Sequence, residues 1–110
     1  MKVAVIGSRS FNDYDKMKSI LDDMEITTIV SGGAIGADSL GAYYAKKHNI
    51  PTLIFKPDWD KHGKAAGFIR NKLIINSSDV VVAFWDGESK GTKHSIDIAN
   101  KLSKEVIIIK

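Results

Sequence analysis

Four polar segments of this sequence hold the residue types that bind phosphate groups. Glycine lets the backbone approach an anion closely, serine and threonine hydroxyls donate hydrogen bonds, and arginine presents a planar fork of donors. Each segment follows a short apolar run, which places it at the end of a predicted strand. The four segments are GSRSFND (7–13), SGGAIGAD (31–38), KPDWDKHGK (56–64) and WDGESKGT (85–92).

The segment SGGAIGAD matches the dinucleotide-binding pattern G-x-G-x-x-G with Ser31 in place of the first glycine. A helix that begins after it would present the backbone amides from Gly33 to Ala37 to an anion. Asp38 then lies in the first helical turn, where it either complements the helix dipole or accepts hydrogen bonds from a ribose. The same pattern also fits a purely structural turn.

The first and fourth segments offer similar groups. Gly7 permits a sharp turn, and Arg9 of the first segment supplies a guanidinium. In the fourth segment, two glycines and Ser89 lead to Thr92, which is a suitable N-cap for a following helix. Both segments are candidate phosphate sites, and both also fit ordinary connecting loops.

The third segment and the helix predicted after it hold larger side chains. Trp59 is able to stack on a base, and His62 is able to bind phosphate or transfer a proton. Arg70 lies beside the apolar stripe of the predicted helix, so its charge requires a partner. Candidate partners are a ligand phosphate and the carboxylates of Asp58, Asp60 and Asp79.

The secondary structure predicted around these segments alternates between strand and helix. Continuous apolar strands indicate a parallel sheet that is covered on both faces, and right-handed crossovers make it doubly wound. Ligands bind such sheets at the carboxyl ends of the strands. Strands are predicted at 3–6, 27–30, 52–55, 79–84 and 106–109, with helices beginning near residues 14 (capped by Asn12 or Asp13), 37, 65 and 92. Gly41 weakens the second helix, which a close approach to the sheet would explain.

Length and composition indicate one cytoplasmic domain over residues 1–110. There is no cysteine, no apolar run of about 18 residues that would cross a membrane, and no residue spacing typical of a metal site. The net charge of +3 mildly favours anionic partners. Because the lysines are scattered along the chain, we interpret them as solvated surface, and nucleic acid is not expected as a partner.

In chain order, the motifs GSRSF, SGGAIGAD, DW…HGKAAGFIRN and VVAFWDGESKGT resemble the SLOG superfamily, and within it the YspA and cpYpsA-related branch. The resemblance covers essentially the whole chain. It implies an α/β Rossmann-like three-layer fold with a five-stranded parallel sheet in the order 3-2-1-4-5. It also implies a nucleotide-derived ligand held by the loops after strands 1, 2 and 4. Relatives include phosphoribohydrolases, DNA-processing DprA proteins and sensors of NAD-derived or ADP-ribose-like signals.

One departure from the resemblance concerns catalysis. The phosphoribohydrolases carry P-G-G-x-G-T-x-x-E after the fourth strand, and alignment at Gly91-Thr92 puts Ser95 at the position of the catalytic glutamate. Serine cannot replace a carboxylate that stabilises an oxocarbenium-like centre. Arg70 does match the arginine of their preceding helix. The binding groups therefore carry over, no catalytic residue is assigned, and enzymatic turnover is not favoured.

These observations predict a protein that senses or sequesters a nucleotide-derived small ligand, either NAD- or ADP-ribose-like or a nucleoside phosphate. No cofactor or metal is required. Two alternatives stay open: a nucleotide N-glycosidase or other nucleotide hydrolase, and a DprA-like DNA-binding accessory. The predicted ligand-binding residues are Gly7, Ser8, Arg9, Ser31, Gly32, Gly33, Ala34, Gly36, Asp38, Trp59, His62, Arg70, Asn71, Trp85, Asp86, Gly87, Ser89, Gly91 and Thr92.

The last predicted strand, 106–109, is fully apolar and lies at an edge of the sheet. Bare apolar edges invite pairing or covering. We therefore also predict a homo-oligomer.

Overall fold

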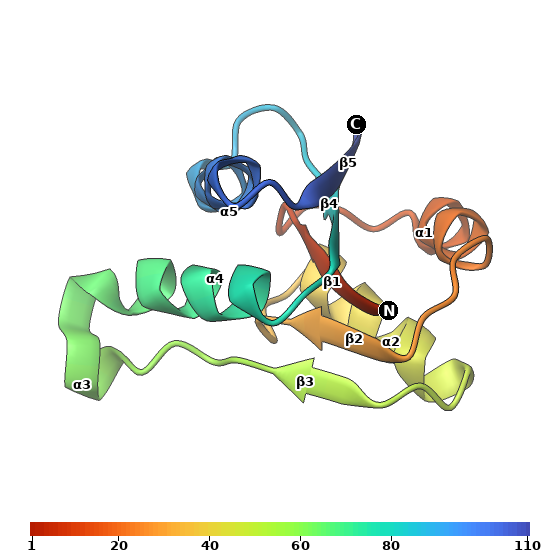
Figure 1. The fold of residues 1–110 in the computed structure, drawn as a ribbon, viewed down its shortest axis with the longest axis horizontal. Helices are drawn as coiled ribbons and strands as arrows, with labels where there is room; N and C mark the ends of the chain where they lie inside the picture. The colour runs from red at the N-terminus through yellow and green to blue at the C-terminus, as the bar shows by residue number, and fades with distance from the viewer.

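A computed structural model describes all 110 residues and contains one parallel sheet of five strands in the order β3-β2-β1-β4-β5 (Figure 1). This confirms the predicted Rossmann-like fold and strand order. The central strands β1 and β4 pair in register from Val3 with Val80 to Gly7 with Phe84. The strands are β1 (Lys2–Gly7), β2 (Thr28–Ser31), β3 (Thr52–Ile54), β4 (Val80–Phe84) and β5 (Glu105–Ile109).

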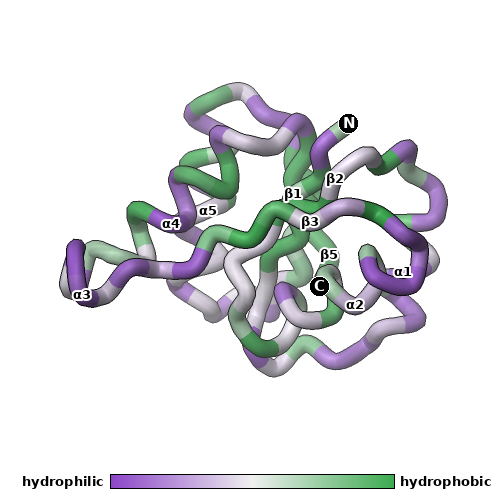
Figure 2. The backbone as a smooth tube through the Cα atoms, turned by 90° about the horizontal axis from the view of Figure 1, so that it is seen from below, coloured by the Kyte–Doolittle hydropathy of each residue, from purple (hydrophilic) through white to green (hydrophobic).

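Four main helices cover the two faces of the sheet: α1 (Tyr14–Leu21), α2 (Ala37–Lys47), α4 (Ala66–Asn76) and α5 (Lys90–Lys101). Helices α1 and α2 pack on one face, where their buried residues join Val3 and Val5 of β1. Helices α4 and α5 pack on the other face against Ala4 and Ile6. Successive residues of β1 are thus buried on opposite faces, which explains why the strand is apolar throughout. Figure 2 shows the apolar strands in the interior and hydrophilic stretches along the outer helices.

A short helix lies within the third polar segment, before the helix that the sequence predicts to begin near residue 65. Helix α3 (Trp59–His62) is followed by a 3-10 turn (Gly63–Ala65) that leads directly into α4. The Asp58 carboxylate caps α3 by accepting the Lys61 backbone N–H at 3.1 Å. In both views α3 projects beyond the end of α4, at the extremity of the molecule (Figures 1 and 2).

The capping residues of the other helices agree with the sequence in one case and differ in another. Asp13 caps α1, as one of the two predicted candidates, by accepting the Lys16 N–H at 3.1 Å. Helix α5 begins earlier than predicted, at Lys90. Its N-cap is Ser89, whose hydroxyl accepts the N–H of Thr92, so Thr92 is the third helical residue rather than the cap. The loop before α5 is correspondingly shorter.

Gly41 lies where α2 crosses β1. A Cβ placed on this glycine would lie 2.8 Å from Cγ1 of Val5, a distance shorter than real Cβ contacts. The predicted close approach of helix and sheet is therefore confirmed.

Two surface features bear on partners. Strand β5 is an edge strand whose Ile108 is exposed, and the covering of this edge by a second copy stays a prediction. None of the helices combines the length and the apolar character that a membrane crossing requires.

Candidate functional site

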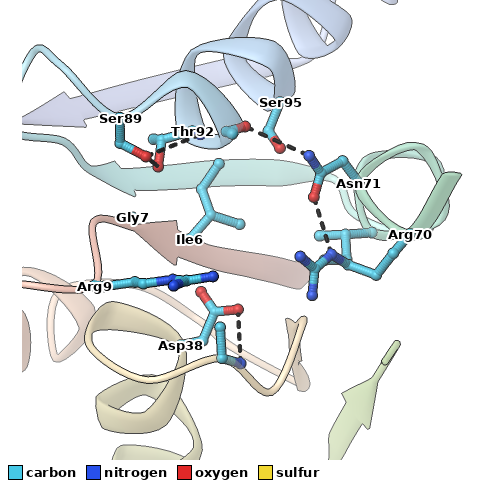
Figure 3. A pocket seen from close by; sticks show the side chains of 12 residues that line it. Ile6, Gly7, Arg9, Asp38, Arg70, Asn71, Ser89, Thr92 and Ser95 are labelled. Atoms are coloured by element: carbon cyan, nitrogen blue, oxygen red, sulfur yellow. Dashed lines mark hydrogen bonds between the residues drawn. The ribbon is translucent and has the colours of Figure 1, made fainter. Parts of the chain in front are cut away.

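A pocket of about 240 Å³ opens at the carboxyl end of β1, between the N-termini of α2 and α5 and the side of α4 (Figure 3). Three of its lining residues are apolar, and the others are mostly polar or charged. The pocket thus lies at the sheet edge where doubly wound folds bind ligands. The lining residues are Ile6, Gly7, Arg9, Ala34, Asp38, Arg70, Asn71, Ile74, Ser89, Gly91, Thr92 and Ser95.

The structure brings nine of the predicted site residues together in this pocket: Gly7, Arg9, Ala34, Asp38, Arg70, Asn71, Ser89, Gly91 and Thr92. They come from the first, second and fourth polar segments and from α4. The predicted residues outside the lining are Ser8, Ser31, Gly32, Gly33, Gly36, Trp59, His62, Trp85, Asp86 and Gly87. Of these, Gly32 still lies directly behind the lining, in contact with Arg70 and Asp38.

Arg70 finds its partners at the turn after β2, and none of the three predicted aspartates is among them. Its guanidinium donates to the carbonyl oxygen of Gly32 at 3.1 Å and to Oδ1 of Asn71 at 3.0 Å. Asp79 accepts instead from the backbone N–H of Lys2, at the opposite edge of the sheet. These contacts leave part of the Arg70 donor fork facing the pocket (Figure 3).

Arg9 and Arg70 approach the pocket from opposite sides. Figure 3 shows the Arg9 side chain extending into the pocket from the loop after β1, while the guanidinium of Arg70 points inward from α4. The Asp38 carboxylate lies between them. Two guanidinium groups around one open cavity form an arrangement suited to phosphate oxygens, which accept bidentate hydrogen bonds from arginine.

The amides of the SGGAIGAD turn are largely used by the chain itself. The Asp38 carboxylate accepts the N–H of Gly32 at 3.0 Å and that of Ala34 at 3.4 Å. The Gly33 N–H donates to Oγ of Ser31. The Ala37 N–H donates to the Ser8 carbonyl. Asp38 thus does more than complement the helix dipole: it is an internal anion that fills part of the predicted phosphate cradle.

Asp38 is 7% exposed, and this burial raises the pKa of its carboxyl above the ordinary value. The amides of Ala34 and Gly32 and the charge of Arg70 oppose the shift without cancelling it. The ionised carboxylate is therefore held at a cost. An added negative charge in the pocket would raise that cost further.

The N-terminus of α5 provides backbone N–H groups that have no acceptor within the protein. The amides of Lys90 and Gly91 donate to no protein acceptor, and Gly91 and Thr92 line the pocket. Asp86 shapes the preceding loop by accepting the N–H groups of Ser89 and Glu88, each at 2.8 Å. These hydrogen bonds lower the pKa of Asp86. The loop is therefore held in place by its own residues, with the free amides next to the cavity.

Three predicted residues lie around a second, smaller cavity of about 150 Å³ beside β5. Ser8, Trp85 and Asp86 line it together with apolar side chains. The Trp85 indole N–H donates to the carbonyl of Ser89 at 3.0 Å, and the Ser8 hydroxyl accepts the N–H of Asp86 at 3.1 Å. In this structure both residues support the loop before α5.

Sequence reasoning missed some residues at or near the pocket. Ile6 and Ile74 form its apolar floor, and nothing in their apolar runs distinguishes them from core residues. Phe68 and His94 pack ring against ring beside the pocket, with centroids 4.5 Å apart. The only signal for Phe68 is an aromatic side chain next to Gly67 at the start of a helix. The structure contains no group of three acidic or histidine side chains placed to hold a metal ion.

Fold and site together define a Rossmann-like α/β protein with an arginine-rich pocket at the carboxyl edge of its sheet. The sequence pattern of the YspA, cpYpsA-related SLOG family matches residues 1–62, and the chain belongs to this family. The resemblance drawn from the motifs is thereby confirmed. A relative over nearly the whole length is the Gene 61 protein of Mycobacterium phage D29. It is 32% identical over an alignment of 117 positions, which covers 96% of this chain and 94% of that protein.

Two solved structures of DNA processing protein A (DprA) are similar to this fold. The Helicobacter pylori protein, which binds single-stranded DNA, matches with a TM-score of 0.76 and 26% identity. The match covers 98% of this chain and 64% of that one. The Streptococcus pneumoniae protein matches in fold with a TM-score of 0.81 and 22% identity, over 99% of this chain and 50% of that one. This chain therefore spans between half and two thirds of the length of both proteins.

The similarity to the H. pylori protein contradicts two expectations from the sequence. One is that the chain senses or sequesters a small nucleotide-derived ligand, and the other is that nucleic acid is not a partner. It favours the DprA-like alternative. The expectation that nucleic acid is not a partner was wrong because it rested on the even spread of lysines along the chain. Residues 56–72 contain five lysine and arginine side chains and two aspartates, so their formal charge is five minus two, or +3. This equals the net charge of the whole chain, so the remainder is balanced.

Proposed function

We propose that this chain binds single-stranded DNA and holds backbone phosphates in the pocket at the carboxyl end of β1. The observation that carries the proposal is the pair of guanidinium groups, Arg9 and Arg70, that face one cavity from opposite sides. The free amides of Lys90 and Gly91 add neutral donors at the positive end of the α5 dipole. Phosphate contacts of this kind supply most of the sequence-independent affinity of DNA-binding proteins.

The distribution of charge supports a polyanion rather than a single small anion. The excess positive charge lies in residues 56–72, which run from the end of β3 through α3 into α4 and border the pocket. Lys56, Lys61, Lys64 and Lys72 are all exposed, and none forms an ion pair. A DNA strand whose phosphates enter the pocket is therefore able to continue along a positively charged surface.

The comparison with the H. pylori DNA-processing protein supports the same proposal. Nearly the whole of this chain superimposes on part of a protein that binds single-stranded DNA. The part of that protein with no counterpart here is not required for the pocket, because every lining residue comes from this chain. The proposed activity is binding alone and includes no chemical step.

Titration of the purified chain with a fluorescent oligonucleotide tests the proposal. We expect single-stranded DNA to bind with an affinity that falls steeply as salt rises, and more tightly than a duplex of the same sequence. Millimolar AMP or ADP-ribose should compete weakly, because each offers few phosphates. Saturable binding of one of these nucleotides with no salt-dependent binding of DNA would contradict the proposal. As a control, Lys47→Ala removes an exposed lysine of α2 outside the pocket, and this variant should bind single-stranded DNA as the wild type does.

A further inference from the structure

Two large aromatic side chains are exposed at the same end of the molecule. Trp59 of α3 is 59% exposed and Phe68 of α4 is 53% exposed. The Trp59 ring lies over Gly67, where a Cβ would lie 3.7 Å from Cη2 of the indole. Gly67 directly precedes Phe68, so the indole packs against the same first turn of α4 that carries Phe68. We call Trp59 and Phe68 the aromatic ledge.

The aromatic ledge is connected to the pocket by direct contacts. The Phe68 ring packs against His94 of α5, with centroids 4.5 Å apart and an interplanar angle of 56°. Nδ1 of His94 lies 3.3 Å from the side-chain nitrogen of Asn71, which lines the pocket. A continuous row of side chains therefore runs from the phosphate-facing cavity through Asn71 and His94 to the exposed ring of Phe68.

The charges around the aromatic ledge suit a nucleic acid strand. Lys61 and Lys64 flank Trp59 and the start of α4, and Lys72 lies one turn beyond Phe68. All three are exposed and unpaired. Burial lowers the pKa of the neighbouring His94, and the charge of Lys72 lowers it further. Exposed aromatics among lysines form the kind of surface on which unpaired bases stack while the backbone is neutralised.

We propose that the aromatic ledge stacks bases of single-stranded DNA whose phosphates occupy the neighbouring pocket. This inference rests on the proposed function and adds the means by which the chain selects unpaired DNA. The bases of a duplex are already stacked on one another and do not present their faces to Trp59 and Phe68. Stacking accepts every base, so the proposal predicts little sequence preference.

Two oligonucleotide probes separate base stacking from phosphate binding. One is a twelve-residue oligothymidylate, and the other is an abasic backbone of the same length and charge. We expect the wild-type chain to bind the oligothymidylate at least about tenfold more tightly than the abasic probe. The double variant Trp59→Ala/Phe68→Ala should lose most of this difference and keep the wild-type affinity for the abasic probe. Trp59→Phe should retain most of it, because phenylalanine still presents a ring.

The control variant is Tyr43→Ala, which removes a 47% exposed aromatic of α2 outside the pocket and should leave both affinities unchanged. Circular dichroism is expected to show folded variants, since both ledge rings are largely exposed. If the wild type binds the two probes equally, or the folded double variant keeps the tenfold difference, base stacking by the aromatic ledge is contradicted and the proposed function stands. If the wild type binds neither probe, the proposed function itself fails.

Discussion

Arg70 and Asp38 meet across a single glycine. The Arg70 guanidinium donates to the Gly32 carbonyl at 3.1 Å, and the Asp38 carboxylate accepts the Gly32 N–H at 3.0 Å. This contact ties α4 to the turn between β2 and α2. It also places a cation and a buried anion at the same wall of the pocket, so the charge that a phosphate meets there is set by both groups.

The size of residue 32 is the first test of this contact. A Cβ at Gly32 would lie 2.5 Å from a guanidinium nitrogen of Arg70 and 2.9 Å from Oδ2 of Asp38. We expect Gly32→Ala to displace one or both side chains, to reduce DNA affinity about tenfold, and to lower the free energy of unfolding by about 1–3 kcal/mol. Oligonucleotide titration and urea unfolding measure the two effects.

Gly91 provides the comparison, because it also lines the pocket but a Cβ there has nothing within 4 Å. Gly91→Ala lies in the first turn of α5 and should raise the free energy of unfolding by up to about 1 kcal/mol. Equal stability losses in both variants would show that the contact at Gly32 is not the cause.

The buried carboxylate makes stability depend on pH. Because burial raises the folded-state pKa of Asp38 above its ordinary value of 3.8, the folded chain holds this proton more tightly than the unfolded chain. The resulting stabilisation is present below the ordinary pKa and is lost as pH rises through the raised one. Urea titrations at increasing pH should therefore show that the free energy of unfolding of the wild type falls relative to that of Asp38→Asn. A wild type that gains stability over the variant as pH rises would reverse the predicted sign.

Asp38→Asn should also strengthen DNA binding at pH 7. The substitution removes a negative charge from the wall of the pocket and weakens its hold on the amides of Gly32 and Ala34. We expect affinity for single-stranded DNA to rise by up to about tenfold, or about 1.4 kcal/mol. Fluorescence anisotropy at fixed salt measures the change, and weaker binding by a variant of unchanged stability would contradict it.

Arg70 should contribute one phosphate contact. Arg70→Ala removes a charge-assisted donor worth about 1.5–3 kcal/mol, so DNA affinity should fall by about 10- to 150-fold. The slope of log affinity against log salt should decrease in magnitude by about 1. Arg70→Lys should recover the salt slope and only part of the affinity, because lysine lacks the planar fork. A loss of affinity with no change of slope would assign Arg70 a structural role.

The N-cap of α5 has a separate thermodynamic signature. The Ser89 hydroxyl accepts the N–H of Thr92 and lies 3.1 Å from the Thr92 hydroxyl. We expect Ser89→Ala to lower the free energy of unfolding by about 1 kcal/mol, as measured by urea titration. Thr92→Val, which leaves the cap in place, should cost less. The opposite order would make Thr92 the residue that begins this helix.

The approach of α2 to β1 is testable by paired substitutions. Gly41→Ala would stabilise an exposed helix, but here the added methyl group meets Val5. We expect a loss of about 1–3 kcal/mol of unfolding free energy. Adding Val5→Ala should recover part of that loss, so the two substitutions should be non-additive in a double-mutant cycle. Additive effects would mean that residue 41 of the helix and Val5 of the strand are not in steric contact.

The alternation of strands and helices, the parallel sheet and the family follow from local patterns in the sequence. Val3 to Ile6 and Val80 to Phe84 are apolar at every position because both faces of the sheet are covered, and that pattern is local along the chain. The polar segments after the strands were equally visible, and nine of the predicted site residues line one pocket. Local periodicity and residue chemistry are enough for these features.

Which groups face one another depends on the tertiary structure. The partner of Arg70 is a backbone carbonyl 38 residues earlier in the chain, and no spacing in the sequence identifies it. The occupation of the turn amides by Asp38 likewise depends on how β2 enters α2. The aromatic ledge requires α3 to fold back over Gly67, inside a segment that has no apolar periodicity. Such contacts arise from the packing of distant loops, whereas sequence patterns report only which side of each element is buried.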